Sequence, residues 1–117
     1  MRADTIPARL QEQAKKRPGH PAYHVKDGGR WIPTTYGTYG QEVREATRAL
    51  MALGLEPGQT VCILGFNRPE WIIMDVAAMT AGGVPAGIYT TCSAEEVQYI
   101  IAHAEARIVL LEDESQW

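Results

Sequence analysis

The 117-residue sequence has few of the residues that mark several large classes of protein. Two cysteines are too few for the disulfide framework of a small secreted protein. The longest apolar run without a charge, 76–92, is interrupted by three glycines and a proline, so it does not predict a membrane-spanning helix. Residues 1–7 lack the apolar core of a secretory signal. We therefore expect a cytoplasmic protein without a transmembrane segment.

Neither sign of charge dominates the chain. Eleven Lys and Arg residues stand against 14 Asp and Glu residues, which gives a net charge of -3. The basic residues do not cluster, which argues against a surface that binds nucleic-acid phosphates, so we expect no nucleic-acid partner. With 45% hydrophobic and 21% charged residues, the composition is that of one modest globular domain.

Groups that bind phosphate or metal ions are also scarce. The three lysines lie outside any glycine-rich loop, and residues 65–70 match neither of the common phosphate-binding loops. The histidines are far in sequence from the cysteines, which gives no metal-ligand spacing: His20, His24 and His103. Cys62 lies in an apolar run and is expected to be a buried hydrophobic side chain.

Helical periodicity and turn residues predict the elements of the first third of the chain. A helix over 5–17 begins at Asp4 or Thr5, and a β-hairpin follows over 22–26 and 30–33, around the turn Asp27-Gly28-Gly29. A long helix over 36–53 follows, and either Thr35 or Thr38 could be its N-cap. Gly54 is placed to terminate it.

From residue 60 onward, short apolar runs alternate with helical patterns. The predicted strands are 60–66, 84–89 and 107–111; the first is apolar throughout, as in a strand buried on both faces. A helix over 68–81 is expected to have Asn67 as N-cap and Glu70 reaching back to it. Ser93 and Glu96 form a capping box that opens the next helix. This order predicts an α/β fold with a parallel sheet and right-handed crossovers, in which 1–35 is a helix and hairpin and 36–117 an αβαβαβ segment.

A few polar residues could carry chemistry. Asp75 stands in the middle of an apolar helix; we favour pairing with Arg68 or with a basic residue outside this chain, and an acid beside a substrate pocket is the alternative. Cys92 precedes a helix N-terminus, but no histidine is near it in sequence to act as a base. The remaining acids are interpreted as first-turn charges and a solvated tail: Glu95, Glu96, Glu112, Asp113 and Glu114.

Several motifs resemble the start of the AMP-forming acyl-CoA synthetases, members of the adenylate-forming enzyme superfamily. Residues 31–39 resemble the family's Trp followed by a Thr-aromatic helix start, and residues 54–61 its glycine-rich turn into a strand, with Gln59 in place of the usual Asp. Asn67-Arg68-Pro69-Glu70-Trp71 matches an Asn-x-Pro-Glu-Trp helix start. Residues 81–91 resemble the family's Ala-Gly-Gly, Pro-x-Tyr-x-Thr segment. Within the family, residues 87–91 and the following 93–96 are most similar to the long-chain, bubblegum-type fatty acyl-CoA synthetases.

The resemblance implies the N-terminal part of the large domain of an adenylate-forming enzyme. Such enzymes couple a fatty acid to CoA through an acyl-adenylate, with ATP, Mg²⁺ and CoA as cofactors and cosubstrates. The family's phosphate loop ending in Lys-Gly, its ribose-binding Asp and its C-terminal catalytic Lys have no counterpart here. No catalytic, cofactor-binding or metal-binding residue is therefore assigned to this chain, which is expected to be a scaffold, inactive alone.

Two other hypotheses are kept. The chain could be a free-standing α/β module that binds a ligand at the carboxyl ends of its strands, near Asn67, Tyr89, Thr90 and Thr91. It could also act in protein interactions, including self-association through uncovered apolar surface. A cytoplasmic protein of this kind could be attached peripherally to a membrane.

Overall fold

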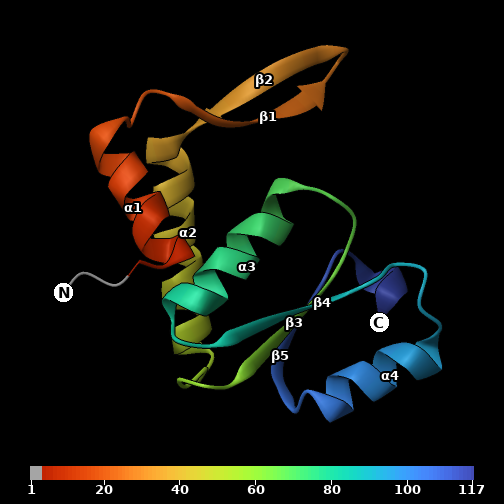
Figure 1. The fold of residues 1–117 in the computed structure, drawn as a ribbon. Helices are drawn as coiled ribbons and strands as arrows, with labels where there is room; N and C mark the ends of the chain where they lie inside the picture. The colour runs from red at the N-terminus through yellow and green to blue at the C-terminus, as the bar shows by residue number, and fades with distance from the viewer. Residues whose placement is uncertain (1–3) are drawn as a thin grey trace.

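Residues 4–117, the part of the chain that the computed structural model describes, form a helix, a hairpin and an αβαβαβ segment (Figure 1). Helix α1 (Ile6–Lys16) begins at Thr5, whose Oγ1 accepts a hydrogen bond from the Ala8 N–H. The antiparallel strands β1 (Pro21–Asp27) and β2 (Arg30–Thr35) follow. The helix and hairpin expected within 1–35 are present, and the first three residues of that segment lie outside the described residues.

The hairpin turn consists of Gly28 and Gly29, with φ of 54° and 79°. Two consecutive positive φ angles are what a two-residue turn needs to match the twist of its strands, and glycine adopts them without steric cost. This turn gives the hairpin that the Asp-Gly-Gly signal predicted.

Helix α2 (Tyr36–Ala52) is capped by Thr35, whose Oγ1 accepts the Thr38 N–H, so the choice that the sequence left open falls on Thr35. The inner face of α2 is buried at Val43, Thr47 and Leu50. The buried Thr47 hydroxyl has a hydrogen-bond partner on its own helix, because it donates to the Val43 carbonyl oxygen at 2.7 Å. The apolar face of α2 thus packs against α1 and α3.

The parallel sheet has the strand order β4-β3-β5, with β3 (Thr60–Leu64) between β4 (Val84–Ile88) and β5 (Ala106–Leu111). Because β3 is the middle strand and helices cover both faces of the sheet, its residues 61–64 are all buried, which explains its continuous apolar run. The α/β class and the parallel sheet predicted from the sequence are confirmed.

Two cores form on the two faces of this sheet. Val61 packs with α1, α2 and α3 (Pro69–Thr80), whereas Cys62 and Leu64 pack with α4 (Ala94–His103). From β3 the chain crosses to β4 on one side, and from β4 it crosses back past β3 to β5 on the other side. Because both crossovers are right-handed and run in opposite directions along the sheet, their helices α3 and α4 lie on opposite faces. Figure 1 shows α4 separated from the other three helices by the strands.

The prediction that Asn67 caps α3 is wrong. Arg68 is the N-cap, with an extended backbone and no side-chain capping bond, and Pro69 takes the first helical position. Proline disfavours the helical conformation in the residue before it, so the helix starts directly at the proline. Glu70 does not reach back to a cap but bonds the Arg68 side chain. The capping box of α4 is present as predicted, with the Ser93 N–H donating to Glu96 at 2.7 Å.

Within residues 4–117, none of the helices combines the length and the apolar character that a bilayer crossing requires.

Candidate site at the carboxyl edge of the sheet

The connections that leave β3, β4 and β5 meet at one edge of the parallel sheet, where ligands bind in open α/β folds. A cleft of about 550 Å³ lies between the β3–α3 and β4–α4 connections. Its wall includes Asn67, Tyr89 and Thr90, three of the four residues that the sequence suggested for a binding edge. Thr91 does not line it. A binding role for these residues stays a prediction.

Trp71 lines both this cleft and a smaller neighbouring pocket of about 130 Å³. The indole ring lies so close to β4 that a Cβ on Gly87 would be 2.9 Å from Trp71 Cζ2. Only glycine leaves room for the ring at this strand position. The close contact joins the first turn of α3 to the end of β4 and shapes both cavities.

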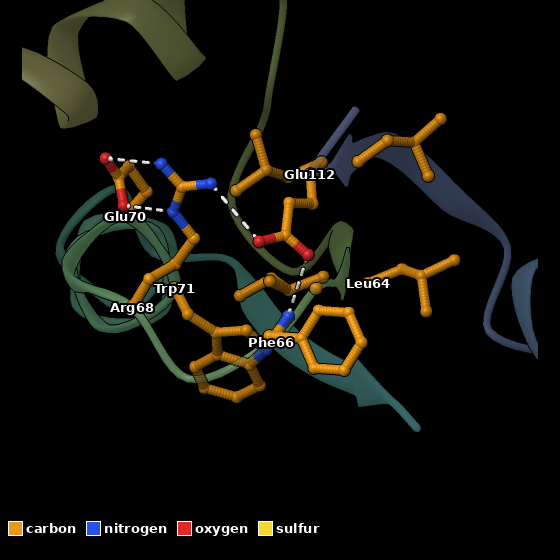
Figure 2. A pocket seen from close by; sticks show the side chains of 10 residues that line it. Leu64, Phe66, Arg68, Glu70, Trp71 and Glu112 are labelled. Atoms are coloured by element: carbon orange, nitrogen blue, oxygen red, sulfur yellow. Dashed lines mark hydrogen bonds and ion pairs between the residues drawn. The ribbon is translucent and has the colours of Figure 1, made fainter. Parts of the chain in front are cut away.

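An ion cluster crosses the smaller pocket, with Arg68 between two glutamates (Figure 2). Arg68 Nε donates to Glu70 Oε2 at 2.8 Å, and Arg68 Nη1 donates to Glu112 Oε1 at 3.2 Å. The other carboxylate oxygen of Glu112 accepts the backbone N–H of Phe66 at 3.2 Å. Glu112 therefore ties the end of β5 to the loop that follows β3.

The interpretation of Glu112 as part of a solvated tail is wrong. Its side chain is only 15% exposed, since it lies against Gly65, and both of its carboxylate oxygens are bonded. Its backbone N–H donates to Gln116 Oε1 at 2.7 Å, which folds the following residues back toward the strand. Sequence alone gave no signal for this cluster, because Glu112 lies 44 residues from Arg68.

The same cluster controls the charge of Glu70. The Arg68 guanidinium beside it lowers the pKa of the Glu70 carboxyl below its ordinary value, mainly through the side-chain hydrogen bond. Both glutamates share the one guanidinium in this lining. Within the described lining of the two cavities, Arg68 is the only cationic side chain, and it is already neutralised.

The favoured pairing of Asp75 with Arg68 is wrong. Arg68 bonds Glu70 and Glu112, and Asp75 stands seven residues further on, about 10 Å along the helix. No hydrogen bond or ion pair joins Asp75 to another of residues 4–117. The carboxylate is half-buried on α3, near enough to Tyr39 of α2 to raise the pKa of its phenol. Burial without a partner raises the pKa of Asp75.

We expect Asp75→Asn to be slightly more stable than the parent protein at pH 7, by less than about 1 kcal/mol because water still reaches the carboxylate. A carboxyl whose pKa is higher in the folded than in the unfolded state favours unfolding once it is ionised. The advantage of the variant should therefore shrink as the pH falls toward the ordinary aspartate range, near 3.8.

Urea unfolding of both proteins at pH 7 and at pH 4 measures this difference. Asp27→Asn, at the exposed end of the hairpin, is the matched control and should change stability little. A stability difference for Asp75→Asn that grows on acidification would contradict the account.

The remaining sequence candidates lie outside the ion cluster. Cys62 is fully buried, as expected, and burial raises the pKa of its thiol. Cys92 is half-buried beside α4, and no described histidine lines the two cavities that it borders. His103 is exposed and stacks on Tyr99, with ring centroids 5.4 Å apart. None of these arrangements provides a nucleophile with a base.

The described edge does not fit the phosphates or the Mg²⁺ of ATP. Residues 4–117 contain no group of three or more His, Cys, Asp or Glu side chains placed to hold a metal ion. Lys15 and Lys16 lie in α1. Lys26 of β1 lines a cavity with residues of the β3–α3 connection, and its ammonium lies over the Trp31 ring, 5.7 Å from the ring centre. No step of phosphate chemistry is therefore derived from these residues.

Comparison with protein families identifies the family to which this chain belongs. Residues 10–116 match the model described as "AMP-binding enzyme", and the chain belongs to this family. The chain is 42% identical over 112 residues to the human long-chain-fatty-acid–CoA ligase ACSBG2, covering 96% of this chain and 17% of that protein. It is 34% identical over 116 residues to the ligase heimdall of Drosophila melanogaster, with 96% and 17% covered.

A solved structure gives the same result for the fold. The inhibitor-bound N-terminal domain of FACL13 from Mycobacterium tuberculosis superposes with a TM-score of 0.82 at 26% identity, over 89% of this chain and 26% of that domain. The expected resemblance to the long-chain, bubblegum-type synthetases is confirmed. The chain spans about a sixth of the length of the curated relatives that it matches.

Proposed function

We propose that this chain forms the N-terminal part of the AMP-binding domain of a long-chain fatty acid–CoA ligase. The reaction is attack of a fatty carboxylate on ATP to give an acyl-adenylate and pyrophosphate, followed by thioester formation with CoA and release of AMP. The 42% identity to human ACSBG2 over almost the whole chain carries the proposal. ATP, Mg²⁺ and CoA are then needed by the whole enzyme, which works in the cytoplasm or at a membrane surface.

Within such an enzyme the role of these residues is to hold one edge of the sheet in shape. The Arg68–Glu112 contact fixes the loop after β3 to the end of β5. The Trp71–Gly87 contact fixes the start of α3 to the end of β4. Transfer of a phosphoryl or adenylyl group needs cations that offset the charge developing on phosphate. The one guanidinium at this edge is already neutralised, so the chain alone is proposed to be inactive.

We expect the purified chain to show no fatty-acid-dependent exchange of labelled pyrophosphate into ATP. A chimera in which this chain replaces the matching 112 residues of human ACSBG2 should make acyl-CoA at a rate within about tenfold of the parent ligase, a tenfold change being 1.4 kcal/mol in the barrier. ACSBG2 without those residues is the control and should be inactive. Exchange catalysed by the chain alone, or a folded but inactive chimera, would overturn the proposal.

A free-standing binding module is the second candidate, favoured by the cleft that Asn67, Tyr89 and Thr90 share. A ligand that binds only the folded state raises its melting temperature by mass action. A carboxylate or nucleotide that raises the melting temperature of the chain in a screen, together with an inactive chimera, would favour this candidate.

A further inference from the structure

The Trp71 side chain is a wall that three cavities share. Besides the cleft and the smaller pocket, a third cavity of about 500 Å³ lies between the β1–β2 hairpin and residues 67–72. Among the described residues, Asn67 and Arg68 each line two of these three cavities, whereas Trp71 lines all three. The size and position of the indole therefore limit how far a ligand in the cleft can extend.

The position of the indole depends on a glycine in β4. A Cβ at Gly87 would lie 2.9 Å from Trp71 Cζ2 and 3.4 Å from Trp71 Cη2. The φ of Gly87 is outside the left-handed region, so the backbone does not require glycine there and the ring does. Glycine inside a strand is otherwise unfavourable and marks a close approach. This contact involves only α3 and β4, so it does not depend on what covers the outer surface.

The cleft and the smaller pocket are apolar apart from charges that already have partners. Arg68, Glu70 and Glu112 bond one another across the smaller pocket (Figure 2). The aliphatic side chains of that pocket come from the two strands beside it: Ile63, Leu64, Leu110 and Leu111. Phe66 and Ile88 add apolar groups to the lining of the cleft. Walls of this kind favour an uncharged, apolar ligand over an anion.

Of the reactants in the proposed reaction, the acyl chain is the part that is apolar and uncharged. We propose that Trp71 is a specificity-determining residue, which limits the bulk of the acyl chain that the cleft admits. The inference rests on the proposed function, because it takes its ligand from that reaction. A smaller side chain at position 71 would join the cleft to the neighbouring cavities, whereas a methyl group at position 87 would narrow the cleft against the indole.

The ACSBG2 chimera tests this inference with palmitate and its ω-phenyl analogue, whose terminal ring needs extra width. We expect Trp71→Ala to raise the kcat/KM of the analogue relative to that of palmitate by about tenfold or more, because even one methylene group can change specificity that much in an apolar pocket. Trp71→Phe should give a smaller rise. Trp117→Ala is the matched control, since it removes a 99% exposed indole that lines none of the three cavities, and it should leave the ratio unchanged.

Gly87→Ala changes the same wall from the side of β4. It should lower the ratio in the parent chimera, but it should change the ratio less than twofold in the Trp71→Ala background, where the methyl group has room. Substitutions at independent sites have additive effects. Additive effects of these two substitutions would therefore contradict a shared wall. Should Trp71→Ala fail to fold, Trp71→Phe takes its place in the comparison, with a partial loss of the Gly87→Ala effect expected.

Equilibrium binding of both fatty acids to the chimera, measured by displacement of a fluorescent fatty acid, separates this inference from the ligase proposal. An active chimera whose substrate ratio is the same in all variants overturns the role of Trp71 and leaves the ligase proposal intact. A folded but inactive chimera whose ratio of affinities changes as described overturns the ligase proposal and supports the role of Trp71 in binding. A folded, inactive chimera whose ratio of affinities stays constant overturns both.

Discussion

Replacing Leu50 by alanine will lower the free energy of unfolding by about 2–5 kcal/mol. Leu50 is 1% exposed and lies in the core between α2, α1 and α3, where its side chain packs with other buried apolar groups. Truncation loses the transfer free energy of the deleted carbons and leaves a cavity that the surrounding helices can fill only in part. For a small domain this is a large share of the total stability.

Leu53→Ala is the matched control, since Leu53 lies one turn further along the same chain segment and is 66% exposed. We expect its effect to stay within about 0.5 kcal/mol. Urea unfolding followed by far-ultraviolet circular dichroism measures both. Equal effects of the two substitutions would mean that α2 does not pack on α1 and α3 as described.

Gly83→Ala should destabilise the protein by about 1–3 kcal/mol, although it adds a single methyl group. A Cβ at this position would be 2.9 Å from the Gln59 carbonyl oxygen and 3.2 Å from that of Ala78. Both contacts are with backbone, which cannot turn aside as a side chain could. The Gly83 N–H also donates to the Ala78 carbonyl oxygen at 2.8 Å, so the segment is held where the clash occurs.

Gly19→Ala is the control for the general effect of replacing glycine. No heavy atom lies within 4 Å of a Cβ built on Gly19, and its φ is outside the left-handed region. Alanine should be neutral there, or slightly stabilising because it restricts the unfolded chain. If Gly83→Ala were as stable as Gly19→Ala, the close approach of the turn before β4 to the turn before β3 would be incorrect.

Local signals in the sequence predicted most of the fold. The apolar run of β3, the Gly28–Gly29 turn and the capping box of Ser93 each act over a few residues, so the residues themselves determine the outcome. The N-cap of α3 was mispredicted because two local rules compete there. Asn67 is a favourable cap, but Pro69 requires the first helical position and fixes Arg68 before it.

Contacts between distant segments were not predictable in the same way. Arg68 had an apparent partner in Asp75 on its own helix, yet it bonds Glu112, which the sheet brings beside it from the end of β5. The pairing of β5 with β3 rather than with β4 determines that meeting. The sequence suggested Asn67, Tyr89 and Thr90 for the candidate binding edge because they follow strands. It did not suggest the ion cluster beside them.

The strand order also determines when both edges of β3 can be paired as the chain is made. β4 can pair with one side of β3 once residue 88 is available, but the other side waits for β5, more than 40 residues after β3 ends. Until then β3, a strand of apolar residues, has an open edge that could pair with another chain. Because long-range parallel pairing is slow, this interval exposes the chain to aggregation. Assistance by a chaperone would matter most between synthesis of β4 and docking of β5.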